Sequence, residues 1–281
     1  MQISGQRSHT FAKPQLRRGK HWQFSYLAVT DVGRKRPLNE DFFLLHPDRD
    51  LYIVADGMGG HAGGEVASRL AGETIAAYFD KRDLPQAVAY QDPMSRHTVL
   101  PHHLVEAVES AHDAIVEAAS RDVERRGMGT TVVALTFCGD RAYWAHVGDS
   151  RLYRMRDGSL EAMTRDHSLL EQQLELHMMT DEEARQFSED FPYKNVLTQA
   201  LGATDSVDVA VDSAPLQSDD LFVMTTDGIH DVIGESAIAE LLSRYRHDLK
   251  KACEEVVVDA NRAGGPDNIT IACVEIRSAD Q

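Results

Sequence analysis

The alternation of apolar and polar positions divides the chain into short strands and two pairs of helices. Apolar or alternating runs predict strands at 24–30, 42–46, 51–55, 195–200, 207–211, 220–226 and 268–276. Apolar residues three and four positions apart predict helices at 64–80, 102–126, 235–246 and 248–263. Between 129 and 168, four short alternating runs separated by Gly-Asp and Asp-Gly pairs predict an antiparallel meander.

This order of elements predicts the fold class α+β. Strands in this number, with the helices in two pairs, favour a central antiparallel β-sandwich flanked by pairs of helices. Residues 1–22 are polar, basic and without periodicity, so we expect a flexible tail before a single domain at 23–278. Residues 168–192 predict a helical, acidic insertion that could act as a flap.

Composition and charge exclude several kinds of partner, cross-link and location. The 281 residues carry a formal net charge of −16, which argues against a nucleic acid or an anionic membrane as the main partner. Cys138, Cys253 and Cys273 have no paired spacing, so neither a disulfide framework nor a zinc site is indicated. No apolar run approaches the ~18 residues of a membrane span and no signal peptide is recognisable, so we expect a cytoplasmic protein.

The glycine-rich run VADGMGGHAGGE, residues 54–65, joins a predicted strand to a predicted helix. Such junctions often hold phosphates or metal ions. The run formally matches the dinucleotide fingerprint, but Asp56 would direct a negative charge at the pyrophosphate and no parallel βαβ pattern follows. A P-loop would need Lys-Ser/Thr at the end of the loop, and that pair is missing from the run.

A serine esterase is a second alternative, through a triad of Ser150, Asp227 and His230. In that class the serine block lies near the start of a doubly wound chain, whereas here it lies in the middle of a β meander. A cysteine-based phosphatase needs Cys followed by five residues and Arg, and none of the three cysteines has this spacing.

Acidic residues at the ends of predicted strands are the main chemical signal. They are Glu40, Asp41, Asp56, Asp149, Asp227 and Asp267. One Asp beside Gly is ordinary turn chemistry, but a converging set needs a counter-charge. Two carboxylates ~4 Å apart repel by about 4 kcal/mol at an effective dielectric constant near 20. Since no His/Cys cluster competes, the set indicates Mg²⁺ or Mn²⁺ with oxygen ligands.

Such a centre could hydrolyse a phosphate ester. Asp56 can bridge two ions and the Gly57 carbonyl can bind one of them, and two bridged ions would lower the pKa of a shared water. Arg36 can hold the phosphate oxygens, and His61 can supply a proton to the leaving alkoxide. Taken singly, Arg36 could be a surface arginine, and His61 could cap the turn.

Seven stretches in order resemble the metal-dependent Ser/Thr protein phosphatases (PPM, or type 2C) in their compact bacterial form. They are VGRKRPLNEDFF, VADGMGGHAGGEVAS, GMGTTVV, AHVGDSRLYRMRDG, LTQALG, TTDGIHD and GGPDNITIACVEI, spread over residues 24–277. The resemblance implies a β-sandwich with helices on both outer faces and a metal-centred cleft at one edge.

The resemblance also implies roles for the motif residues. Asp56 would bridge two Mn²⁺ or Mg²⁺ ions with the Gly57 carbonyl, and Asp227 and Asp267 would complete the ligands of the first ion. Glu40 and Asp41 would hold metal-bound waters, Arg36 would bind the phosphate and His61 would be the general acid. Asp149, Asp227 and Asp231 would form a weaker third-metal site.

The function implied is hydrolysis of phosphoserine and phosphothreonine monoesters on proteins, opposing a bacterial Ser/Thr kinase. A non-catalytic phosphoprotein-binding module on the same fold is the alternative, and the complete set of acids disfavours it. The chain departs from the usual pattern at EDFPYKN, where Lys194 is the only cation, and at Gln199, where arginine is frequent. These departures concern the flap and the choice of peptide.

Overall fold

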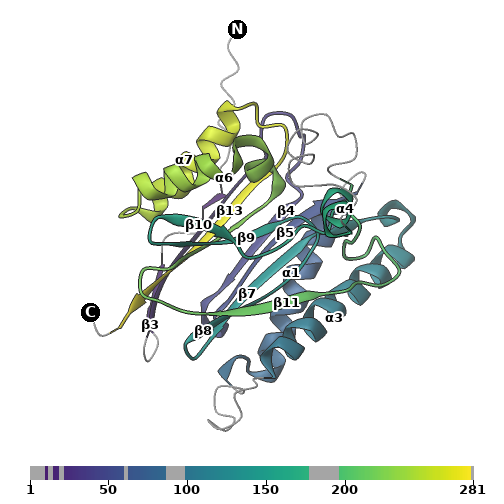
Figure 1. Ribbon diagram of the computed structural model, residues 1–281. Coiled ribbons are helices and arrows are strands. Elements are labelled where there is room, and N and C mark those ends of the chain that lie inside the picture. Colours follow the sequence, from purple (N-terminus) through teal and green to yellow (C-terminus); the bar gives the residue numbers. More distant parts are fainter. Residues whose placement is uncertain are drawn as a thin grey trace.

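Two antiparallel β-sheets stacked face to face form the centre of the protein, and helices cover both outer faces (Figure 1). The structure is a computed structural model that describes residues 22–59, 63–86, 99–176 and 196–279, with the backbone alone of 10–11 and 15–18. The α+β sandwich expected from the sequence is confirmed.

The first sheet is built from both ends of the chain. Its strands, in spatial order, are β1 (Thr10–Phe11), β3 (Trp22–Asp31), β13 (Ile269–Ser278), β12 (Leu221–Thr225), β9 (Arg151–Arg156) and β10 (Ser159–Ala162), and β2 (Gln15–Arg18) also pairs with β3. This part of the predicted tail is therefore paired with the sheet.

The second sheet contains the glycine-rich junction. Its order is β11 (Ala210–Pro215), β8 (Arg141–Val147), β7 (Val132–Cys138), β5 (Leu51–Met58) and β4 (Asp41–His46), with β6 (Gly129–Thr130) pairing with β5. The predicted meander is wrong in one respect, since β7 and β8 belong to this sheet and β9 and β10 to the other. Alternation predicts strands but does not specify their sheet, and the crossing places Asp149 at the seam.

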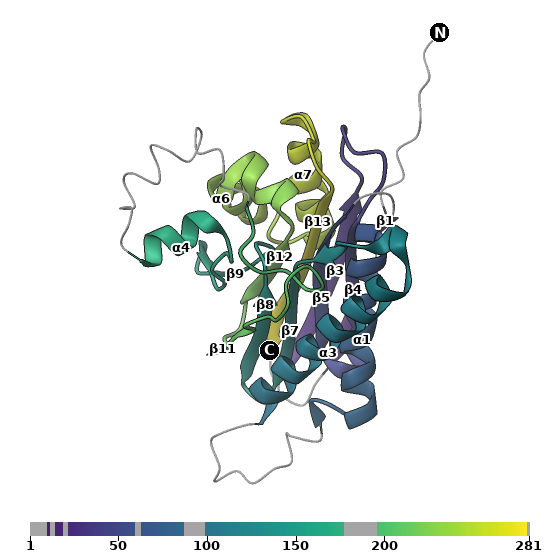
Figure 2. The same cartoon turned by 90° about the vertical axis from the view of Figure 1, so that its right-hand side faces the viewer.

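A pair of long helices covers each sheet. Figures 1 and 2 show α1 (Gly63–Arg82) and α3 (Leu100–Arg121) on the second sheet, and α6 (Asp227–Arg244) and α7 (Leu249–Arg262) on the first. The short helix α4 (Leu169–Glu175) stands beside the body, and the 3-10 turns η1 (Pro47–Arg49) and η2 (Val123–Arg125) complete the set.

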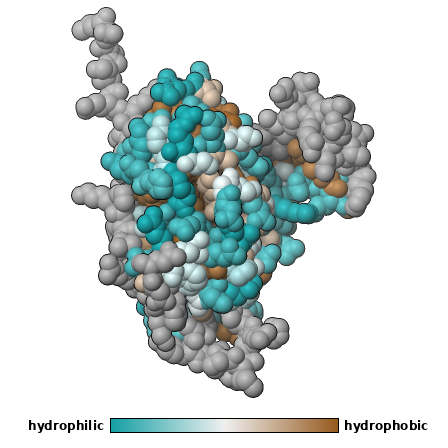
Figure 3. Space-filling view, turned by 60° about the vertical axis from the view of Figure 1, so that its left-hand side comes forward, coloured by the Kyte–Doolittle hydropathy of each residue, from teal (hydrophilic) through white to brown (hydrophobic). Residues whose placement is uncertain are grey.

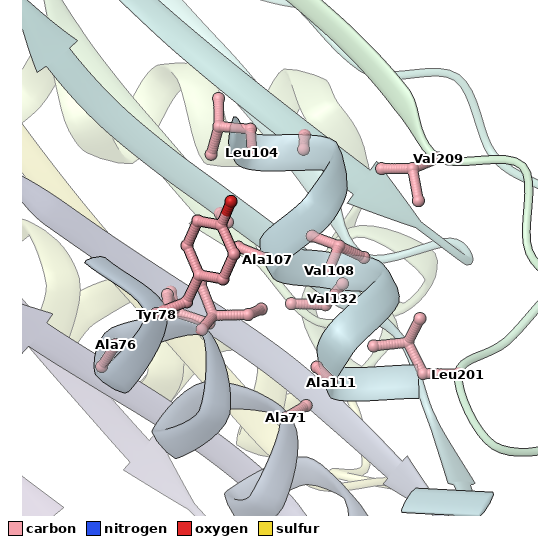
Figure 4. Packing of buried hydrophobic residues seen from close by; sticks show 14 of the residues in the cluster. Ala71, Ala76, Tyr78, Leu104, Ala107, Val108, Ala111, Val132, Leu201 and Val209 are labelled. Carbon is pink, nitrogen blue, oxygen red and sulfur yellow. The ribbon is translucent and has the colours of Figure 1, made fainter. Parts of the chain in front are cut away.

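Three apolar layers hold the elements together, one between the sheets and one under each helix pair. Strand β5 shows why LYIVA is apolar throughout: Leu51 and Ile53 face α1 and α3, whereas Tyr52 and Val54 face the other sheet. Figure 4 shows the packing of α1 on α3, where Ala71 and Ala107 allow the helices to approach closely.

Some predicted boundaries are wrong. Residues 196–200 form a loop with a single bridge, Ser168 to Leu197, in place of a strand, and the strand predicted at 207–211 begins at Ala210. Helix α6 begins at Asp227 and not at the predicted residue 235. The prediction is late because the helix is kinked at Gly234, whose φ is 75°, and the periodic pattern starts only after this kink. The second half of the predicted flap, from residue 177, lies outside the described residues.

The described surface is predominantly polar. In Figure 3, hydrophilic residues cover most of the visible described face, and the hydrophobic areas are small and scattered. Within the described ranges, the helices are too short or too polar to cross a membrane.

Candidate active site

Strand ends of both sheets meet at a cavity of about 450 Å³. The lining residues are Arg36, Glu40, Asp56, Gly57, Met58, Gly59, Thr131, Asp149, Leu197, Asp227, Asp267 and Asn268. Asp56 comes from the second sheet, Asp267 lies two residues before β13 of the first, and Asp149 lies at the crossing between the sheets. The fold thus brings acidic residues from distant parts of the sequence to one cavity.

Two threonines fix the backbone of Asp56. Its N–H donates to Thr131 Oγ1 at 3.0 Å, and its carbonyl accepts from Thr131 N at 2.9 Å and from Thr130 Oγ1 at 2.8 Å. With its backbone groups bound in this way, Asp56 has its side chain left to line the cavity. The strand-turn-helix junction therefore presents one carboxylate on a rigid support.

Asp41 lies directly opposite Asp56 in the β4–β5 pairing. Its Oδ2 accepts hydrogen bonds from Thr226 Oγ1 at 2.9 Å and Thr270 Oγ1 at 2.6 Å, whereas its buried Oδ1 has no partner among the described residues. Burial, only partly offset by these hydroxyls, raises the pKa of Asp41 to about 7. Like charges directly opposite on paired strands are unfavourable, so this pair indicates a site that needs a cation.

Three further carboxyl groups of the cavity also have raised pKa values. Burial, with repulsion from Asp227 next, raises the pKa of Asp149 to about 8. Burial, followed by repulsion from Asp267 and Asp231, raises the pKa of Asp227 to about 6. For Asp56, burial and the neighbouring acids raise the pKa well above the ordinary range. Together these shifts show that the cavity concentrates negative charge without a matching positive charge.

The cation of the described lining is Arg36. Its Nη2 lies 2.7 Å from Asp267 Oδ2, so the guanidinium contacts one of the predicted ligands. Asn268 ties this corner together, because its Oδ1 accepts from Glu40 N at 2.8 Å and its Nδ2 donates to Leu38 O at 2.9 Å. The predicted phosphate-binding residue and a predicted ligand therefore lie at the same rim.

Gly57 and Gly64 allow the backbone to close around this corner. A Cβ on Gly57 would lie 2.1 Å from Gly64 O and 2.5 Å from Glu40 O, and a Cβ on Gly64 would lie 2.4 Å from Glu40 Oε1. No larger side chain fits at either position without moving backbone atoms. The glycines therefore bring Glu40 and Asp56 to one cavity.

The donor chemistry of the cavity fits hard divalent ions. In the described part of the chain, Asp41 and Asp227 each have a buried carboxylate oxygen without a hydrogen-bond partner, and the lining is dominated by oxygen donors. Within the described ranges, no three His, Cys or acidic side chains are already grouped closely enough to bind one ion. The side chains would have to rotate toward each ion as it binds.

The structure brings most of the predicted site residues together. Arg36, Glu40, Asp56, Gly57, Asp149, Asp227 and Asp267 all line the cavity. Asp41 lies buried beside them, and the exposed Asp231 lies one helical turn after Asp227 in α6. His61 lies outside the described residues.

Sequence reasoning did not identify the threonines that support the acids. Thr131 lies in the GTT stretch, and Thr226 and Thr270 each lie within three residues of a predicted ligand. All three are buried and hydrogen-bonded to Asp41 or to the backbone of Asp56. The sequence gives one indication of them: each is a polar residue in or beside an apolar run that predicts a buried strand.

The raised pKa values predict that the metal-free protein loses stability as pH rises. A carboxyl group with a folded pKa above its unfolded value stabilises the fold at low pH, and this contribution is lost as pH rises through the folded pKa. The loss begins above the unfolded pKa of about 4 and continues until the pH passes the folded pKa, about 7 for Asp41 and about 8 for Asp149. His146, whose pKa is lowered to about 4 by burial, has an opposite effect only below its ordinary pKa of about 6.5.

Between pH 6.5 and 8.5 we expect the free energy of unfolding in EDTA to fall by on the order of 1–2 kcal/mol. Saturating Mn²⁺ should abolish the fall, because the ions replace the bound protons as counter-charge. Urea denaturation across this range measures the effect. A slope that is equal with and without Mn²⁺ would contradict it.

Known proteins are similar to this chain in sequence and in fold. The sequence profile of the family described as "Protein phosphatase 2C" matches residues 34–259. The protein phosphatase PhpP of Streptococcus pneumoniae is 32% identical over 255 residues, which cover 90% of this chain and 97% of that protein.

Solved structures agree. The serine/threonine phosphatase of S. agalactiae is similar with a TM-score of 0.77 and 30% identity, over 90% of this chain and 99% of that chain. The catalytic domain of the phosphatase PstP, solved in complex with two manganese ions, is similar with a TM-score of 0.74 and 29% identity, over 91% of this chain and 99% of that chain.

Proposed function

Because the chain belongs to the protein phosphatase 2C family, we propose that it hydrolyses phosphoserine and phosphothreonine monoesters through divalent ions held in the acidic cavity. It is a phosphoprotein phosphatase, and its substrates are phosphorylated proteins. The observation that supports the metal site best is the meeting of Asp56, Asp149, Asp227 and Asp267 in one cavity, with the pKa values of three of them raised.

The cavity residues divide into ligands and substrate-binding groups. Asp56, the Gly57 carbonyl, Asp227 and Asp267 would hold two ions, with Asp149 and Asp231 beside Asp227 for a third. When bound, the ions would neutralise charge on the phosphoryl oxygens and lower the pKa of a water. Mn²⁺ or Mg²⁺ suits these oxygen donors, and the two manganese ions of PstP support this choice.

The remaining groups would handle the substrate. Arg36, half-exposed at the rim, would bind the phosphoryl oxygens with a planar fork of N–H donors. Glu40 and Asp41 would accept hydrogen bonds from water and orient it toward phosphorus. His61 would give a proton to the serine or threonine alkoxide as it leaves.

The direct test is hydrolysis of a phosphothreonine peptide with Mn²⁺, followed by release of inorganic phosphate. We expect turnover with the phosphothreonine and phosphoserine peptides, and loss of turnover in EDTA. A protein that binds these peptides without releasing phosphate would be the non-catalytic module of the alternative reading, and the proposed function would then be wrong.

Ser150→Ala separates this function from the serine-esterase alternative. Ser150 is 1% exposed and its Oγ lies 2.7 Å from Thr131 Oγ1, while His230 Nδ1 lies 2.9 Å from Thr225 Oγ1. Since one neutral hydrogen bond contributes about 1 kcal/mol, we expect Ser150→Ala to retain p-nitrophenyl phosphate turnover within about fivefold. EDTA should abolish turnover in both proteins. Turnover of p-nitrophenyl acetate that survives EDTA and disappears in Ser150→Ala would identify an esterase, because that class cleaves carboxylic esters.

A further inference from the structure

A chain of buried and half-buried hydroxyl groups runs from the first sheet to Asp41 in the second. Thr30 on β3 and Thr270 on β13 are directly paired, and their Oγ1 atoms lie 2.7 Å apart. Thr270 Oγ1 donates to Asp41 Oδ2 at 2.6 Å, and Asn39 Nδ2 donates to Thr30 Oγ1 at 2.8 Å. These hydrogen bonds therefore link both sheets next to Asp56, which lies opposite Asp41 and lines the cavity.

The direction of every hydrogen bond in this chain can be assigned. A hydroxyl has one proton, and the proton of Thr270 goes to Asp41, so the Thr30 hydroxyl must donate to Thr270. The lone pair of Thr30 then receives the amide proton of Asn39. All donors point toward Asp41, an arrangement in which successive hydrogen bonds strengthen one another.

Thr226 supplies a second donor to the same oxygen. It is the N-cap of α6, a position where threonine usually caps its own helix, yet its side chain makes no cap and donates to Asp41 Oδ2 at 2.9 Å. Thr270 N holds the Thr226 hydroxyl in place by donating to its Oγ1 at 3.0 Å. A hydroxyl withdrawn from helix capping indicates a role in the site.

These contacts leave one oxygen of the Asp41 carboxylate, Oδ1, available to a further partner. Oδ2 is occupied by two O–H donors, and Asn39 Oδ1 accepts from the Asp41 backbone N–H at 3.2 Å. Oδ1 is buried and has no hydrogen bond to any residue that the structure describes. Both the rotamer and the available oxygen are thus determined by neighbouring side chains.

We propose that Thr226 and Thr270 are positioning residues that fix the Asp41 carboxylate so that Oδ1 is held toward the divalent-ion site. Thr30 acts behind them by orienting Thr270. The inference rests on the proposed function, because it assumes that the acidic cavity binds such ions. Groups that orient the partners of a metal centre commonly alter metal affinity or activity 10–100-fold when removed.

The test is Mn²⁺ affinity, measured by calorimetry on the full chain. Thr270→Val and Thr226→Val remove the hydroxyl with little change of shape, and we expect each to weaken Mn²⁺ binding about tenfold. Thr270→Ser keeps the hydroxyl and should stay within about twofold of the native protein. The Mn²⁺ affinity of Thr30→Val should lie between those of Thr270→Val and Thr270→Ser, because Thr30 acts on Asp41 only through Thr270.

Thr225→Val is the matched control. Thr225 is fully buried beside Thr226, and its hydroxyl bonds to His230, away from Asp41. We expect native Mn²⁺ affinity in this variant, whatever its melting temperature in EDTA. Equal Mn²⁺ affinity in Thr270→Val and native protein, or an equal loss in Thr225→Val, would overturn the inference.

Three further outcomes of these experiments are distinguishable. If Thr270→Val does not fold, Thr226→Val alone decides, since it removes the second donor to the same oxygen. If the native protein hydrolyses phosphopeptides only with Mn²⁺ and Thr226→Val binds Mn²⁺ normally, the positioning role is wrong and the proposed function stands. If the native protein binds no Mn²⁺, the proposed function itself is wrong.

Discussion

Asp56→Asn is expected to lower kcat for p-nitrophenyl phosphate by about 10³-fold or more while making the metal-free fold more stable. Activity should be lost because Asp56, the proposed bridging ligand, loses its charge. The stability rises because the pKa of Asp56 is raised by burial and by four neighbouring acids, so the ionised form is unfavourable without a cation. Turnover with Mn²⁺ and urea denaturation in EDTA measure the two effects.

Asp205→Asn is the control for this prediction. Asp205 is exposed and does not line the cavity, so the same substitution there should leave both quantities unchanged. Asp227→Asn should repeat the pattern of Asp56→Asn, with a smaller gain in stability because its pKa is raised less, to about 6. Native-like turnover in either active-site variant would exclude the assigned ligands.

Gly57→Ala is expected to destabilise the protein by about 3 kcal/mol or more and to abolish turnover with Mn²⁺. The new Cβ would lie 2.1 Å from Gly64 O and 2.5 Å from Glu40 O, both backbone atoms that cannot rotate away. Relief of this overlap must separate β5 from the start of α1 or from Glu40. Urea denaturation gives the loss of stability, and calorimetry with Mn²⁺ reports the damage to the site.

Gly139→Ala provides the comparison. Gly139 has a positive φ of 62° and nothing within 4 Å of its Cβ position, and it lies in the turn at the far end of β7. The cost there is only that of the left-handed backbone, roughly 1 kcal/mol, and turnover should be native. If the two variants lose equal stability, close packing is not the reason for glycine at position 57.

The sequence predicts the central strand and its terminal acid because both follow local rules. Strand β5 is buried on both faces, so its apolar run is continuous and ends where Asp56 meets the cavity. The start of α6 illustrates the opposite case. Gly234 interrupts the helix, so periodicity detects only the part after the kink, and the turn that begins at Asp227 has too few residues to show a period.

The supporting threonines could not be predicted for another reason. Thr270 meets Asp41 across 229 positions of sequence, and the contact exists only because β13 and β4 come from different sheets that pack together. No local pattern encodes such a contact. The loop at 196–200 is similar, since LTQA has the pattern of a strand but pairs with the described chain only at the single bridge from Leu197 to Ser168.

The crossing of the chain from β8 to β9 has a consequence for how activity is gained and lost. Asp41 and Asp56 belong to one sheet, while the residues flanking Asp227 and Asp267 belong to the other. Activity should therefore depend on the correct packing of one sheet against the other, and an intact sheet alone should not be sufficient. Mild heat or pressure that loosens this joint should silence the enzyme before circular dichroism records any melting of strands or helices.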